Sequence, residues 1–173
     1  MGEFKLSIAV IAILRAVHIA FGAFWLGGVA SLGFFLVPWL RTVRPFGAGS
    51  AAQVATVRRL LTVVAVSGVI AVAAGHILYF GLWQGAGFSG PGFWYAAGGQ
   101  PANIAVLLTS AIAWPAAYRL SAFVRSRTSP ESPLTDEQAG KVDRLVRRVA
   151  WSTQVSAALL VGAVVCMAIG RYV

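Results

Sequence analysis

The fold is decided by the stretch LSIAVIAILRAVHIAFGAFWLGGVASLGFFLVPWL, residues 6–40, in which Arg15 and His18 are the only ionisable residues. An α-helix rises about 1.5 Å per residue, so a helix of this length exceeds a bilayer hydrocarbon core of about 30 Å. We therefore predict a first transmembrane helix that tilts, projects from the bilayer or bends near Pro38.

Three further apolar runs follow, at residues 57–88, 101–126 and 146–172. The run at residues 101–126 begins at Pro101, a residue favoured in the first turn of a helix, and contains Pro115 as an expected kink. Together with the first helix, these runs predict an all-α integral membrane four-helix bundle that forms a single transmembrane domain over the whole chain.

The last helix has a start signal of its own. Thr135 with Gln138 three residues later forms a capping-box pattern, and an amphipathic extension at residues 136–148 follows. The first turns of this helix are therefore expected in water or at the membrane surface. Polar residues farther along are expected to make interhelical hydrogen bonds; they are Ser152, Thr153, Gln154 and Ser156.

The composition excludes a water-soluble fold, because 58% of the residues are hydrophobic and 11% are charged, against about 45–50% and 25% in soluble proteins. The net charge of +9 does not indicate nucleic acid, since the basic residues cluster beside the apolar runs, where membrane orientation explains them. The lipid bilayer is the expected partner. The single cysteine, Cys166, excludes an intrachain disulfide and a cysteine-based zinc or iron–sulfur site.

Loop charges predict the orientation. The basic residues gather where the first run adjoins the second and where the third adjoins the fourth, in residues 41–59 and 119–148. These two basic segments hold 11 of the 14 basic residues: Arg41, Arg44, Arg58, Arg59, Arg119, Arg125, Arg127, Lys141, Arg144, Arg147 and Arg148. The segment WQGAGFSGPGFWYAAGGQPAN between the second and third runs has no charge. By the positive-inside rule, both termini are expected on the extracytoplasmic side of the cell membrane.

Both histidines of the chain, His18 and His76, fall inside apolar runs, where ionisable residues are functional candidates. Residues on consecutive antiparallel helices lie at equal depth when their midpoint is the centre of the turn, and the midpoint here is Gly47, within the turn sequence RPFGAGS. We therefore predict that the two imidazoles are level to within about one helical turn, in the outer half of the membrane.

Level imidazoles on facing helices are the axial ligands that a haem b iron takes in a helical bundle. Gly22, one turn beyond His18, is expected to leave room for the macrocycle. The residues expected to pack against it are Phe21, Trp25 and, on the face of His76, Tyr79.

Arg15 lies three residues from His18, one turn nearer the outside. If the haem propionates point outward, its guanidinium is placed to pair with one of them. A simple alternative is that Arg15 snorkels to the outer head groups.

Two alternatives to haem stay open. Cys166 and Met167 could offer copper(I) soft ligands together with the histidines, although Met1 is the only other methionine. The histidines could also be a purely structural pair that hydrogen-bonds between helices. No carboxylate lies in any predicted span, so a membrane-embedded hydrolase site is not expected.

The segment VHIAFGAFWLGGVASL places Trp25, Gly27 and Gly28 after His18 with a spacing that resembles the first helix of copper-resistance D-type membrane domains. The resemblance covers about one helix. In that superfamily helix-borne histidines serve copper uptake in some members, and other members resemble four-helix membrane b-type cytochromes, so the resemblance implies that His18 and His76 are ligands. This chain departs from the copper-handling pattern in having four spans rather than a longer set, only two histidines and only two methionines.

The combined expectation is a membrane haem b protein that transfers single electrons near the extracytoplasmic face, possessing one haem ligated by His18 and His76. A redox partner, a quinone and a second copy of the chain are left open as partners. A copper-handling transporter and a structural tetraspan subunit are the alternative functions.

Overall fold

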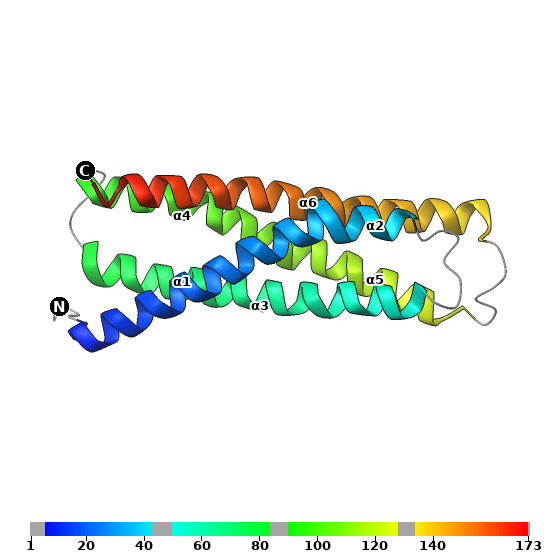
Figure 1. Cartoon of the computed structure of the whole chain (residues 1–173), viewed down its shortest axis with the longest axis horizontal. Coiled ribbons are helices and arrows are strands. Elements are labelled where there is room, and N and C mark those ends of the chain that lie inside the picture. The colour runs from blue at the N-terminus through cyan, green and yellow to red at the C-terminus, as the bar shows by residue number, and fades with distance from the viewer. Residues whose placement is uncertain (1–5, 43–49, 84–89, 128–133, 173) are drawn as a thin grey trace.

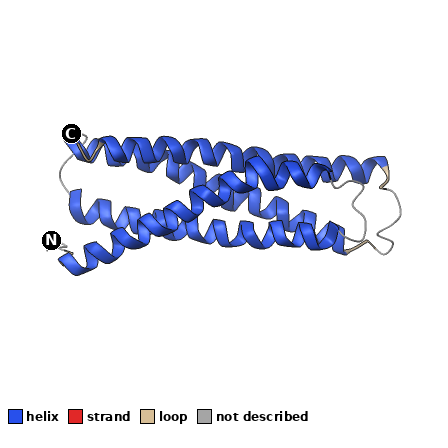
Figure 2. Ribbon diagram, viewed as in Figure 1, coloured by secondary structure: helices blue, strands red, loops and turns tan. Residues whose placement is uncertain are grey.

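The computed structural model describes residues 6–42, 50–83, 90–127 and 134–172, and these ranges contain helices joined to a few loop and turn residues, with no strand (Figure 2). The elements are α1 (Ile8–Ser31), η1 (Leu32–Leu36), α2 (Val37–Thr42), α3 (Ser50–Trp83), α4 (Gly90–Leu107), η2 (Leu108–Ala113), α5 (Trp114–Arg125) and α6 (Asp136–Ile169). The labels η1 and η2 denote π-helical turns.

Four continuous helical stretches are long and apolar enough to cross a membrane: Ile8–Leu40, Ala51–Leu82, Gly92–Arg125 and Asp136–Ile169. They lie side by side in one elongated bundle, and both chain ends lie at the same end of it (Figure 1). The predicted all-α four-helix bundle is confirmed. We call the end that holds the termini the terminal end and the opposite one the basic end.

Two predicted helix starts differ from the structure. The second helix begins at Ser50 rather than residue 57, and the third begins at Gly90, so Pro101 lies inside the helix and not in its first turn. The missing N–H of a proline removes one backbone hydrogen bond, whereas packing holds the helix on both sides of it. A Cβ at Gly98 would lie 2.9 Å from the Ala163 carbonyl oxygen, which shows how closely α4 packs on α6.

The start of the last helix agrees with its capping-box pattern. The Gln138 backbone N–H donates to Thr135 Oγ1 at 3.3 Å, and the Thr135 backbone N–H donates to Gln138 Oε1 at 3.2 Å. The amphipathic extension is therefore continuous with the apolar part of α6.

The irregularities expected near Pro38 and Pro115 take the form of π-helical turns just before each proline. The Val37 N–H donates to the Leu32 carbonyl instead of the Gly33 carbonyl, which leaves Gly33 without its usual backbone donor. The next residue, Pro38, has no N–H to offer. The Gln154 side chain supplies the missing donor, because its Nε2 donates a hydrogen bond to the Gly33 carbonyl at 2.9 Å.

The same arrangement recurs at η2, where the Trp114 N–H donates to the Thr109 carbonyl and Pro115 follows. Nearby, Thr109 Oγ1 and Ser156 Oγ lie 3.3 Å apart in a buried hydrogen bond between η2 and α6. Of the polar residues expected to link helices, Gln154 and Ser156 do so, whereas the Ser152 and Thr153 hydroxyls donate to carbonyls of their own helix.

Candidate functional site: a histidine pair at the seam between α1 and α3

The register of α1 against α3 is fixed by two glycines. A Cβ at Gly75 would lie 2.8 Å from His18 Cε1, and a Cβ at Gly68 would lie 2.7 Å from Trp25 Cε2. In both pairs the residue numbers add to 93, so the helices are antiparallel and His18 is level with Gly75, the neighbour of His76. The two histidines therefore lie at the same level, as the turn-centre argument predicted.

His18 is half-buried in this seam. Its Nδ1 lies 2.7 Å from the Ala71 carbonyl oxygen of α3. Because a carbonyl can only accept a hydrogen bond, Nδ1 of the neutral ring must carry the hydrogen, and Nε2 keeps its lone pair. Nε2 is thus the nitrogen through which His18 could ligate a metal.

His76 has the same chemistry in a different setting. Its Nδ1 lies 2.9 Å from the Val72 carbonyl oxygen, one turn back on its own helix, and its side chain is exposed. The Phe80 ring centroid lies 6.2 Å from that of His76. Two adjacent carbonyls of α3, those of Ala71 and Val72, therefore hold the Nδ1 atoms of both histidines and leave both Nε2 atoms free.

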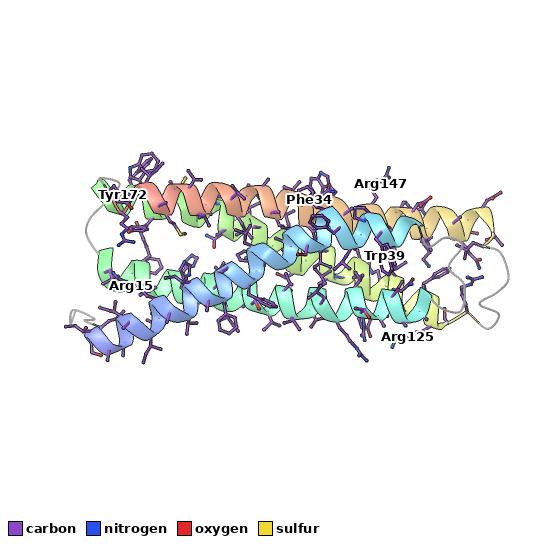
Figure 3. The ribbon with its side chains drawn as sticks, in the orientation of Figure 1. Arg15, Phe34, Trp39, Arg125, Arg147 and Tyr172 are labelled. Carbon is purple, nitrogen blue, oxygen red and sulfur yellow. The ribbon has the colours of Figure 1, made fainter. Side chains whose placement is uncertain are left out.

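The residues predicted to surround the haem lie on two different sides of the seam between α1 and α3. An α-helix turns by about 100° per residue, which places Arg15, Gly22, His76 and Tyr79 on one side, here called the outward flank. Arg15 is exposed near the terminal end (Figure 3), and a Cβ at Gly22 would meet no atom within 4 Å. Tyr79 is half-buried, and its ring is nearly perpendicular to the Phe80 ring at a centroid distance of 5.7 Å.

Phe21 and Trp25 lie on the other side, away from His76. Trp25 is 2% exposed and fills the core over Gly68, while Phe21 packs against the same core cluster. Trp25 Nε1 is buried and has no hydrogen-bond partner among the described residues. The structure thus brings His18 to the level of His76 and places Arg15, Gly22 and Tyr79 on the same side of the seam as His76, but it does not place the other two aromatics beside its ring.

These residues fit haem in donor chemistry, since both imidazoles present a free Nε2. They do not hold a macrocycle within the seam, because the His18 ring occupies the space beside Gly75. The outward flank has room above Gly22. Ligation by both histidines on that flank requires the His18 ring to leave the Ala71 carbonyl.

The copper alternative uses residues from a different interface. A Cβ at Gly98 would lie 2.9 Å from Met167 Cγ and 3.4 Å from Cys166 Cβ, so both sulfur residues pack toward α4. In the described part of the chain, no three side chains among His, Cys, Asp and Glu gather as a metal-binding group. The described packing therefore does not bring the sulfur ligands to the histidines.

Sequence reasoning missed the part played by Gly75 and Gly68. A signal for them exists, since His18 and Trp25 are seven residues apart on α1 and the two glycines are seven residues apart on α3. Matching seven-residue spacings are typical of large side chains that fit small ones across a helix pair.

Comparisons with protein-family models, curated proteins and solved structures found no match to this chain. The resemblance of the first helix to copper-resistance D-type domains therefore stays a prediction.

Proposed function

We propose that this chain is a membrane haem b protein that transfers single electrons near the extracytoplasmic face, with His18 and His76 as axial ligands. One observation carries the proposal: two imidazoles lie at one level with Nδ1 held by neighbouring backbone carbonyls, so that both Nε2 atoms are available. The bond of His76 Nδ1 to the Val72 carbonyl would fix the tautomer and ring orientation of that ligand and raise its basicity. His18 would give up its bond to the Ala71 carbonyl on binding the iron. Haem, when bound, supplies the one-electron chemistry.

Arg15 supports the proposed position near the membrane surface. By the register of the seam it is level with Leu78, which lies 20 residues along α3 from Arg58. Twenty helical residues span about 30 Å, the thickness of the hydrocarbon core. Arg15 and Arg58 thus bracket the core, and in our proposal Arg15 pairs with a haem propionate at the extracytoplasmic boundary.

The proposed orientation follows from charge. The described arginines and lysine of the two basic segments gather at the basic end, opposite both termini, and cytoplasmic loops carry such an excess. We therefore place the termini outside and the electron donor or acceptor, a redox protein or a quinone, on the extracytoplasmic side.

Visible spectroscopy of the purified full chain from haem-replete cells tests the proposal. Two imidazoles on one iron give a six-coordinate, low-spin haem with sharp bands when reduced, and we expect one haem per chain. Gly27→Ala serves as a control, because a Cβ there meets no atom within 4 Å. Colourless protein that carries stoichiometric copper would instead support the copper-handling function.

A structural tetraspan subunit is the second candidate, and the hydrogen bond from His18 to the Ala71 carbonyl favours it. An interhelical bond of this kind stabilises a membrane bundle by about 0.6 kcal/mol on average without any cofactor. Protein that contains neither haem nor copper, yet loses stability on His18→Ala, would support this candidate.

A further inference from the structure

Four side chains interlock on the surface between α3 and α5, close to the basic end. The Arg58 guanidinium lies over the Tyr118 ring, 6.0 Å from its centroid, and the Tyr118 and Trp114 ring centroids are 6.0 Å apart. Trp114 Nε1 donates to Thr62 Oγ1 at 3.0 Å. The pairs Arg58 with Tyr118 and Thr62 with Trp114 are in one antiparallel register, so two consecutive turns of both helices hold the guanidinium in place.

Arg58 is half-buried, and its Nε is a buried donor that no described residue satisfies. An unsatisfied buried donor costs about 1–3 kcal/mol, and more when the group is charged. Its aromatic neighbours are open to the outside, because Trp114 is 39% and Tyr118 48% exposed. The arrangement is therefore a half-buried cation held beside an exposed aromatic surface.

The depth of this cluster matches the lipid head groups. Arg58 and Arg59 directly precede the uncharged part of α3. The exposed Trp39 also lies in the half of the bundle toward the basic end (Figure 3). Exposed Trp and Tyr are enriched at the membrane–water interface. The basic half of the bundle carries further exposed basic side chains; they include Arg59, Arg119, Arg125, Arg147 and Arg148.

An apolar stripe continues from the cluster into the membrane. Val66 and Val69 follow Arg58 and Thr62 along one face of α3, and they are 53% and 52% exposed. A soluble anion would use the guanidinium but not this stripe. A phospholipid would use both, since its acyl chains run along the same face.

We propose that Arg58, held against Tyr118 beside Trp114, binds the phosphate of an anionic phospholipid whose acyl chains lie along Val66 and Val69. The planar guanidinium offers paired N–H donors that match phosphate oxygens. The positive charge of the surrounding basic end favours an anionic lipid over a zwitterionic one. This site is separate from the histidine pair and does not depend on the proposed haem.

The test titrates the purified full chain in neutral detergent with phosphatidylglycerol, phosphatidylcholine or inorganic phosphate. Thermal unfolding is followed, because a ligand that binds only the folded state raises Tm with concentration and so reports Kd. We expect phosphatidylglycerol to raise Tm and the other two to have little effect. Equal stabilisation by phosphatidylcholine would overturn the anionic specificity, and equal stabilisation by inorganic phosphate would overturn the lipid.

Three amino-acid substitutions distinguish a defined lipid-binding site from a general attraction of anionic lipid to the positive charge of the basic end. Arg58→Gln should weaken phosphatidylglycerol binding about tenfold, since it removes both a charge near the surface and a phosphate ligand. Arg59→Gln is the matched control, which removes one charge from the adjacent exposed position and should weaken binding at most about twofold. Tyr118→Leu keeps the charge and should also weaken binding several-fold, because the ring that positions Arg58 is lost.

Each variant is compared with itself without lipid, so a change in basal stability does not obscure the result. Equal losses in Arg58→Gln and Arg59→Gln would show that charge alone attracts the lipid. Full phosphatidylglycerol affinity in either Arg58→Gln or Tyr118→Leu would also refute the site.

Discussion

Replacing Gly75 with alanine tests whether the His18 ring is seated in the seam. The added methyl would lie 2.8 Å from His18 Cε1 and 3.0 Å from its Nδ1, closer than carbon and nitrogen atoms approach without a shift. Either the helices separate or the ring turns out and loses its bond to the Ala71 carbonyl. Overpacking costs about 1–3 kcal/mol, and the lost interhelical hydrogen bond adds about 0.6 kcal/mol.

Gly27→Ala is the matched control, because both changes gain the helix propensity of alanine, about 1 kcal/mol, while a Cβ at Gly27 meets no atom within 4 Å. The propensity gain cancels when the two variants are compared. We expect Gly75→Ala to be less stable than Gly27→Ala by about 2 kcal/mol, measured by equilibrium unfolding in mixed micelles without haem. Equal stability of the two variants would refute the packing of His18 on Gly75.

Three further predictions concern the histidine pair and the orientation. His18→Ala and His76→Ala should each abolish six-coordination of the haem iron. The double variant should lose little more haem binding than the worse single variant, because the effects of residues that act as a unit are non-additive. A low-spin spectrum that survives either change would place the second ligand elsewhere. Gly22→Leu should raise the haem-free stability by up to about 1 kcal/mol through helix propensity but reduce haem occupancy, since its side chain would fill the outward flank. Unchanged occupancy would mean that haem does not lie there. In a cysteine-free background, cysteines engineered at residues 90–99 should be labelled from outside the cell and those at residues 128–135 should not, and the opposite sidedness would reverse the proposed topology.

The depth of the histidines could be predicted from the sequence, whereas the directions of their side chains could not. Depth depends on the rise per residue and on one turn centre, both of which are nearly fixed for an antiparallel helix pair. Direction depends on which face of α3 receives α1, and that face is chosen by the small residues Gly68 and Gly75. His76 follows Gly75 and so points about 100° away from the seam.

The start of the third helix shows a second limit of sequence reasoning. Proline is common in first turns, so a start at Pro101 was the natural expectation. The chain is helical from Gly90 because packing of α4 on α6 around Gly98 outweighs the loss of one backbone hydrogen bond. Such a contact joins residues about 65 positions apart in the sequence, and local propensity contains no information about it.

The π-helical turn η1 acts as a one-residue insertion that changes the phase of the first helix. Every side chain after it is rotated by about 100° relative to an unbroken α-helix. As a result Val37 and Leu40 are buried while Trp39 faces outward. An unbroken α-helix of the same length would turn Trp39 to the face that Leu40 now occupies, toward the core. Deleting one residue of η1 would restore the regular hydrogen-bonding pattern and keep Trp39 facing outward, so the extra residue in η1 is what sets the face of Trp39.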